Sequence, residues 1–168
     1  LTQAQTQAVE SMLAHLDMSN ASVRDAMAFC CDHSASACAV VAHITAAFQA
    51  GALRTSTAAT IGAVAALLAK LFLVSDLLCG AAAHTTAAFR PVLQSALPII
   101  FEALRPPSET STNHVALLRL REGVTKVLRT WERWSVLPKH HITKLYDACG
   151  LGTTAAAAEA SAHHHNQP

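Results

Sequence analysis

The sequence predicts an all-α fold, because it is rich in alanine and its apolar residues recur at helical spacing. Of the 168 residues, 52% are hydrophobic but only 5% are aromatic, and much of the apolar content is alanine, a strong helix former with little preference for strands. Apolar residues recur at helical spacing along most of the chain. We expect one helical domain over residues 1–151, since this length can bury a sizeable core, and a low-complexity, disordered tail over residues 152–168.

Three short helices are expected in the first third of the chain. The first carries an apolar row that ends at Leu16. The second opens at Ser22, which is spaced to form a capping box with Asp25. The third runs from about residue 35 to Gly51, because glycine commonly caps a helix C-terminus.

The fourth helix is expected to be the central one. It starts within residues 56–59, ends at Cys79-Gly80 and is apolar around most of its circumference, which is typical of a helix packed on several sides. Its longest apolar stretch, residues 58–74, contains Lys70 and falls short of the ~20 residues that a membrane span needs. We therefore expect a buried helix and no membrane association.

Three further segments complete the pattern. Pro91 suits the first turn of a fifth helix, and Pro98 predicts either a kink or a division into two pieces. After a loop at residues 105–112, residues 113–134 form an amphipathic helix with an apolar stripe and a second, mostly basic stripe. Residues 141–149 form the last helix. Short connections between so many helices predict a superhelical stack of helical hairpins.

Charge is distributed unevenly along a chain whose formal net charge is only +1. Through residue 104 there are four basic and six acidic residues, a balance of −2, whereas residues 105–147 hold eight basic and four acidic residues, a balance of +4. The overall charge argues against a general nucleic-acid coat. The basic C-terminal third predicts a surface for an acidic partner.

No metal site, cofactor site or catalytic site is predicted. The histidines have no neighbouring carboxylate suited to catalysis, and no nucleophile pair or glycine-rich phosphate loop stands out. The five cysteines lack a zinc-ligand spacing and are interpreted as reduced, small core residues. They are Cys30, Cys31, Cys38, Cys79 and Cys149. We expect a non-enzymatic protein.

Asp76 is the candidate functional residue that the pattern itself identifies. It lies near the end of an otherwise apolar helix, in Phe72-Leu-Val-Ser-Asp76, where an unpaired acid costs stability. Asp76 must therefore pair with a neighbouring group or receive a ligand. The pattern by itself favours a neighbouring partner.

Three segments resemble, in order and spacing, the domain that binds the C-terminal tail of RNA polymerase II, the C-terminal-domain interaction domain (CID). They are Ala26-Met-Ala-Phe-Cys-Cys-Asp-His33, Lys70-Leu-Phe-Leu-Val-Ser-Asp76 and Trp131-Glu-Arg-Trp-Ser-Val-Leu-Pro138. The resemblance covers residues 9–151 and is greatest to the domain of the SURP-motif, U2-snRNP-associated splicing factors. It implies a right-handed superhelix of about eight helices, similar to VHS and ENTH domains, and a nuclear protein that links splicing or RNA processing to transcription.

The resemblance also implies a set of binding residues for a phosphorylated peptide of the heptad YSPTSPS. Asp76 matches the aspartate that accepts a hydrogen bond from the heptad tyrosine, and Gly80 stands where relatives often have an asparagine that holds the peptide turn. Lys126 stands where relatives use arginine for a phosphoserine, and lysine gives up the bidentate geometry. The remaining expected contacts are Phe72 and Thr130 for the peptide and Arg129, Arg133 and Arg24 for phosphate.

Two other classes stay open. A VHS- or ENTH-type trafficking adaptor is disfavoured because residues 1–16 contain no lysine or arginine. The other is a structural helical scaffold in which Asp76 and Lys126 are merely solvated. RNA and spliceosomal proteins are expected only as accessory partners of a monomer. RNA binding ranks below peptide binding because no exposed aromatic platform for bases is evident. Trp131 is assigned to the core, and for Trp134 packing on the last helix is favoured over partial exposure.

Overall fold

The computed structural model describes residues 1–53, 60–80, 87–106 and 113–152, and all regular structure within these ranges is helical. The all-α prediction is therefore confirmed. The predicted tail lies outside the described residues apart from its first residue. The helices are α1 (Gln3–His15), α2 (Asn20–Asp32), the short 3₁₀ helix η1 (Ser34–Ser36), α3 (Ala37–Ala50), α4 (Ile61–Cys79), α5 (Phe89–Ala103), α6 (His114–Arg133) and α7 (Lys139–Ala148).

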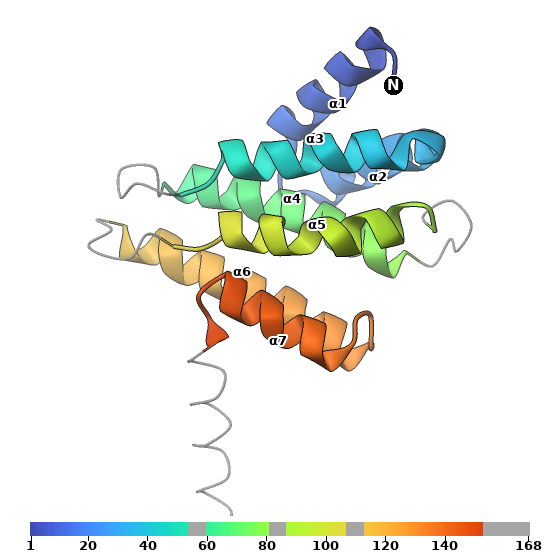
Figure 1. Ribbon diagram of the computed structural model, residues 1–168. Helices are drawn as coiled ribbons and strands as arrows, with labels where there is room; N and C mark the ends of the chain where they lie inside the picture. Colours follow the sequence, from blue (N-terminus) through green and yellow to red (C-terminus); the bar gives the residue numbers. More distant parts are fainter. Residues whose placement is uncertain (54–59, 81–86, 107–112, 153–168) are drawn as a thin grey trace, which may run out of the picture.

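The helices stack in two adjacent rows (Figure 1). One row contains α1, α3, α5 and α7, each packed on the next, and the other contains α2, α4 and α6. Successive helices along the chain therefore alternate between rows, as in a stack of helical hairpins. This arrangement is consistent with the expected helical superhelix, of which the described residues hold seven α-helices.

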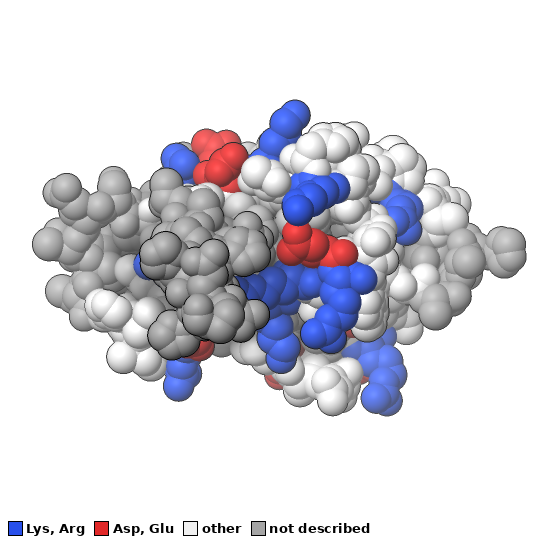
Figure 2. All heavy atoms as spheres, turned by 90° about the horizontal axis from the view of Figure 1, so that it is seen from below, with Lys and Arg blue, Asp and Glu red and all other residues white. Residues whose placement is uncertain are grey.

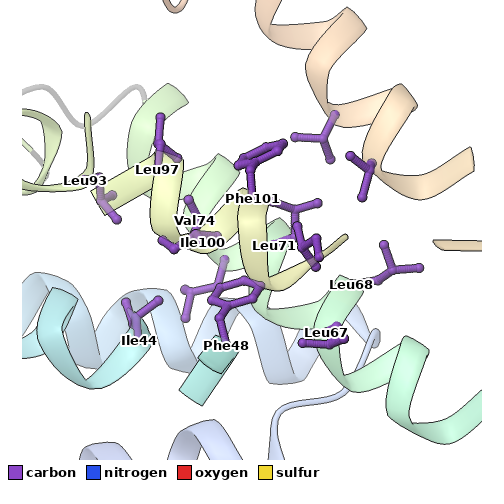
Figure 3. Close-up of a cluster of buried hydrophobic side chains, with 14 of the residues drawn as sticks. Ile44, Phe48, Leu67, Leu68, Leu71, Val74, Leu93, Leu97, Ile100 and Phe101 are labelled. Atoms are coloured by element: carbon purple, nitrogen blue, oxygen red, sulfur yellow. The ribbon is translucent and has the colours of Figure 1, made fainter. Parts of the chain in front are cut away.

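The core lies between the two rows and is centred on α4. Figure 3 shows side chains of α3, α4 and α5 converging, with Phe48 and Phe101 on either side of Leu71. Within the described part of the chain, α4 is by itself long and apolar enough to cross a membrane, but 56% of its most apolar window is buried in the protein. Its position between α2, α5 and α6 accounts for that apolar character as a core helix.

Lys70 is the exception to the apolar core of α4. Its side chain is buried, and its Nζ donates a 3.4 Å hydrogen bond to the carbonyl oxygen of Ala66. Burial lowers the pKa of the Lys70 ammonium, because the charged form is poorly solvated there.

Several predicted helix boundaries need correction. The hydroxyl of Ser19 accepts a hydrogen bond from the Ser22 backbone N–H at 3.2 Å, so Ser19 rather than Ser22 caps α2. Ser22 instead accepts from the backbone N–H of Asp17 at 3.1 Å. Gly51 does end α3, but with a φ of −86° rather than a left-handed conformation. Finally, α5 runs through Pro98 as one helix and is not divided.

Two contacts fix the register between α4 and α6. A side-chain carbon at Gly123 would lie 2.5 Å from Cδ2 of Leu68, so glycine lets the two helices approach closely here. Two turns further along both helices, Nε1 of Trp131 donates a 2.9 Å hydrogen bond to Oγ of Ser75. From the first contact to the second, the residue numbers rise in both helices, from Leu68 to Ser75 in α4 and from Gly123 to Trp131 in α6. The two helices therefore run parallel, and their C-terminal halves lie side by side.

Candidate functional site

A hollow of about 490 Å³ opens between α2 and α4 and contains Asp76. Residues one turn apart share a face of a helix, and α2 and α4 each supply such a face to the hollow. A volume of this size falls within the usual range for small-ligand pockets. The lining residues are Met18, Asn20, Val23, Arg24 and Met27 from α2 and the turn before it, and Phe72, Ser75 and Asp76 from α4.

Asp76 has no hydrogen bond and no ion pair with any described residue. Its carboxyl is exposed to the hollow, and partial burial raises its pKa, because desolvation disfavours the charged form. Arg24 lines the same hollow but forms no ion pair with it. The neighbouring partner that the sequence pattern favoured is therefore not found among the described residues, within which the Asp76 carboxylate is an unpaired acceptor beside apolar side chains.

Phe72 lies one turn before Asp76 and forms part of the apolar wall of the hollow. Its ring is half-buried and packs against the core. Val23 and Met27 of α2 provide apolar surface to the same hollow. The hollow thus combines a carboxylate acceptor with surface suited to an aromatic or aliphatic side chain.

A second hollow, of about 550 Å³, lies on α6 and is mostly basic. Figure 2 shows that Lys and Arg side chains gather on this end of the molecule, with a few acidic side chains among them. Four of the residues that the resemblance assigns to peptide or phosphate, namely Lys126, Arg129, Thr130 and Arg133, share this surface. The other described lining residues are Arg121, Glu122 and Thr125.

Arg129 is partly engaged by α7. Partial burial raises the pKa of the Tyr146 phenol, while the nearby positive charge of Arg129 opposes that rise. Lys126 and Arg133, by contrast, are exposed and have no hydrogen bond or ion pair from their side chains to described residues. Lys126 and Arg133 are therefore the freer cations for an anionic ligand.

The structure divides the expected binding residues between the two hollows. Asp76 and Arg24 lie in the α2–α4 hollow, so Arg24 is not grouped with the other phosphate candidates. The hydrogen bond between Trp131 and Ser75 lies at the boundary between the two hollows, which we call the seam. Ser75 lines the first hollow, and Trp131 directly follows Thr130, which lines the second. Gly80 lines neither hollow; it caps α4 with a φ of −50°.

Sequence reasoning missed Arg90, whose hydrogen bonds connect α5 to the segments at the C-terminal ends of α4 and α6. Its Nη2 donates a 2.6 Å hydrogen bond to the carbonyl oxygen of Val136, and its Nη1 donates a 3.5 Å bond to that of Leu78. Arg90 therefore ties α5 to the C-terminal end of α4 and to the turn after α6. No local pattern could reveal it, since its partners are 12 and 46 residues away.

The two tryptophans differ sharply in burial. Trp131 is fully buried, as predicted, but Trp134 is 64% exposed, so the prediction that it packs on the last helix is wrong. Val136 and Leu137 are buried after it instead. The chain reverses at Ser135, which has a φ of +50°, and this turn leaves the Trp134 ring outside.

The cysteines only partly match their predicted role as core residues. Cys30 and Cys149 are buried, and desolvation raises their pKa values to about 12 and about 11. Cys38 is exposed, so its assignment to the core is wrong. No group of three or more His, Cys, Asp or Glu side chains suited to one metal ion occurs among residues that the structure describes.

Known proteins similar to this chain include two from Arabidopsis thaliana. The chain is 29% identical over 147 residues to "Protein RRC1-like" and 28% identical over 144 residues to "Protein RRC1". The alignments cover 86% and 84% of this chain but 15% and 14% of those proteins. No family model matches the chain, and no solved structure gives a significant match. The chain is thus distantly similar to RRC1 proteins and spans about one seventh of their length.

Proposed function

We propose that this protein is a non-enzymatic domain that binds the phosphorylated heptad-repeat tail of RNA polymerase II, and that it links splicing or RNA processing to transcription in the nucleus. The observation that carries the proposal is Asp76, a carboxylate that has no hydrogen bond or ion pair with the described residues and lies beside apolar side chains in the α2–α4 hollow. It stands in the Val-Ser-Asp segment by which the chain resembles CIDs. The similarity to one segment of the RRC1 proteins supports a role as a module of a larger protein.

The α2–α4 hollow would take the heptad tyrosine. A tyrosine side chain has an apolar ring and a hydroxyl that needs a partner when it is buried. The ring would lie against Phe72 and Met27, and its hydroxyl would donate a hydrogen bond to Asp76. Binding would thus give the Asp76 carboxylate a hydrogen-bond donor.

The α6 hollow would take a phosphoserine of the same peptide. A phosphate adds about −1.5 to −2 charges near pH 7, and Lys126 and Arg133 offer cations that are not paired with any described residue on this surface. The peptide would cross the seam at Ser75 and Trp131 to reach both hollows. A proline-rich chain in the polyproline II conformation rises about 3.1 Å per residue, so one heptad extends over ~20 Å at a low entropic cost of ordering.

The test is fluorescence anisotropy with two-heptad YSPTSPS peptides, unphosphorylated or phosphorylated at the second or fifth position. We expect phosphorylation to strengthen binding to the wild type, Asp76→Ala to abolish binding of every peptide, and Lys126→Ala to remove only the gain from phosphate. Glu102→Ala in α5 and Lys144→Ala in α7 are matched controls, because both residues are exposed and line neither hollow.

Two results would overturn the proposal. Folded wild-type protein that binds none of the peptides would show that this scaffold has another ligand. Binding that is unchanged in both Asp76→Ala and Lys126→Ala would show that the two hollows are not the site. Circular dichroism of each variant establishes that the comparison is between folded proteins.

A further inference from the structure

Trp134 is the most exposed large apolar side chain among the described residues, at 64% exposed surface. An indole ring has a large apolar face, so leaving it in water forgoes the free energy that burial would provide. Trp131, three residues earlier, is fully buried in the same helix. The core therefore uses one tryptophan of the pair and leaves the other available for a partner.

The backbone around Trp134 is held firmly even though its ring is exposed. After α6, the N–H of Ser135 donates to the carbonyl oxygen of Glu132 at 3.1 Å, and that of Val136 donates to the carbonyl oxygen of Trp131 at 2.9 Å. This pair of bonds, with Ser135 in the left-handed region, is a Schellman motif. Arg90 also binds the carbonyl oxygen of Val136. A ring on so fixed a turn loses little backbone freedom when a partner stacks on it.

Trp134 extends the row of side chains that lines the α6 hollow. It follows Thr130 by four residues and Lys126 by eight, and residues at these spacings lie on one side of a helix. The hollow itself contains four cations, Arg121, Lys126, Arg129 and Arg133, and one acid, Glu122. From Arg121 to Trp134 the helix rises about 20 Å, so a positive strip of that length ends in an exposed aromatic ring.

We propose that the α6 surface binds single-stranded RNA, with Trp134 stacking on a base and the four cations of the hollow contacting phosphates. Single-stranded nucleic acids are bound by this combination of a basic groove and aromatic rings, and stacking accepts any base. The choice of RNA rests on the proposed function, which places the protein beside nascent transcripts. The surface itself does not depend on Asp76, which lies in the other hollow.

Lys126 belongs to both the proposed phosphopeptide site and the proposed RNA site. RNA and phosphopeptide should therefore compete for the α6 surface, while the unphosphorylated peptide should compete less. Such competition would let a transcript displace the phosphorylated part of the tail without any change in the fold.

The test uses the wild-type protein, a fluorescein-labelled oligouridine of about 12 nucleotides, and the variants Trp134→Ala, Trp134→Phe and Arg121→Gln. We expect Trp134→Ala to weaken binding about tenfold, and Trp134→Phe to weaken it less because phenylalanine still stacks. Arg121→Gln should weaken binding and reduce its salt dependence, because one phosphate contact is lost. Lys144→Ala in α7 is the matched control, since it removes an exposed cation outside the hollow. The affinity should fall steeply as salt rises.

Tryptophan emission gives an independent readout, because the chain contains only two tryptophans. Unlabelled oligouridine should quench the emission of the wild type through stacking on Trp134. It should leave the emission of Trp134→Phe unchanged, since the remaining Trp131 is fully buried. Quenching of both proteins alike would contradict stacking at Trp134.

The variants separate this inference from the proposed function. Asp76→Ala should lose peptide binding and keep wild-type affinity for RNA, whereas Trp134→Ala should lose RNA affinity and keep binding of the unphosphorylated peptide. The inference is overturned if Trp134→Ala binds oligouridine as the wild type does, or if Lys144→Ala weakens binding as much as Arg121→Gln. Tighter binding of duplex RNA or of oligodeoxythymidine would also overturn it.

Discussion

Nε1 of Trp131 donates a 2.9 Å hydrogen bond to the hydroxyl of Ser75, and this bond joins α6 to α4 beside the candidate tyrosine site. Ser75 lines the α2–α4 hollow and immediately precedes Asp76. Trp131 is fully buried and packs its ring against Phe101 at a centroid distance of 5.8 Å. The bond therefore satisfies a buried polar group and fixes the position of the hollow's wall.

Trp131→Phe should destabilise the fold by about 1–3 kcal/mol, because it removes the hydrogen bond and leaves a space where the larger ring was. Ser75→Ala should cost about 1–3 kcal/mol, since it leaves a buried indole N–H without its partner. The double variant should cost less than the sum of the two changes. Urea denaturation of the four proteins measures this coupling, and strictly additive losses would show that the bond contributes nothing.

Asp76→Asn should raise the stability of the free protein at neutral pH. The folded-state pKa of Asp76 is raised by partial burial, so between the ordinary and the raised pKa the folded state binds more protons than the unfolded state. Stability from this group is therefore lost as pH rises through that window, and the loss persists at neutral pH. The side chain is exposed, so solvent screening keeps the effect below about 1 kcal/mol.

Thermal denaturation at several pH values checks the sign for Asp76→Asn. The gain in Tm should be largest at neutral pH and should vanish below the ordinary pKa of the carboxyl, where both states are protonated. Glu102→Gln, a change of the same chemistry on an exposed face of α5, controls for the loss of one charge. A lower Tm for Asp76→Asn at neutral pH would show that the carboxylate already has a stabilising partner.

The helices were predictable because their signals are local. Thr60 and Asn113 accept hydrogen bonds from backbone N–H groups three residues later and start α4 and α6. The start of α6 is where it was expected, whereas the start expected for α4, within residues 56–59, lies outside the described residues. The start of α2 was misassigned because Ser19 and Ser22 are both suitable caps three residues apart. Only the bond from the Asp17 N–H to the Ser22 hydroxyl shows which serine is free to cap.

The candidate site was predictable only in part, because much of it depends on contacts between residues that are distant in sequence. Asp76 and the basic stripe of α6 are local patterns, so the sequence alone identified them. Their separation into two hollows depends on how α2, α4 and α6 pack. The exposure of Trp134 depends on the turn at Ser135, and the hydrogen bonds of Arg90 depend on partners distant in sequence. Helical periodicity predicts neither feature.

Gly80→Asn should strengthen binding of the heptad peptide. Gly80 caps α4 at a φ of −50° and a ψ of 123°, which any residue can adopt. An asparagine there would supply the amide that the resemblance expects one turn after Asp76, and one more hydrogen bond is worth about 1 kcal/mol, or roughly fivefold in affinity. Peptide anisotropy measures the gain, and Gly80→Ala separates the amide from the loss of glycine flexibility. Equal affinities for the two variants would exclude a role for the amide.

Lys126→Arg should increase the preference for phosphorylated over unphosphorylated peptide. Both side chains are positively charged, but only a guanidinium can donate two parallel hydrogen bonds to one phosphate. The ratio of the two affinities should rise several-fold, while the affinity for unphosphorylated peptide stays constant. Lys144→Arg, on α7 and outside the hollow, is the matched control. A ratio that changes equally in both variants would point to general electrostatic attraction.

Ser135→Gly should stabilise the turn that presents Trp134. Ser135 has a φ of +50°, a conformation that costs a residue with a side chain about 1–2 kcal/mol relative to glycine. Glycine also makes the unfolded chain more flexible, which offsets roughly 0.4–1 kcal/mol of that gain, so the net increase in stability should lie between zero and about 1.6 kcal/mol. Urea denaturation measures it, and Ser135→Val provides the opposite case, because a β-branched side chain is poorly accommodated at positive φ. A variant with valine as stable as the one with glycine would mean that the turn carries no backbone strain.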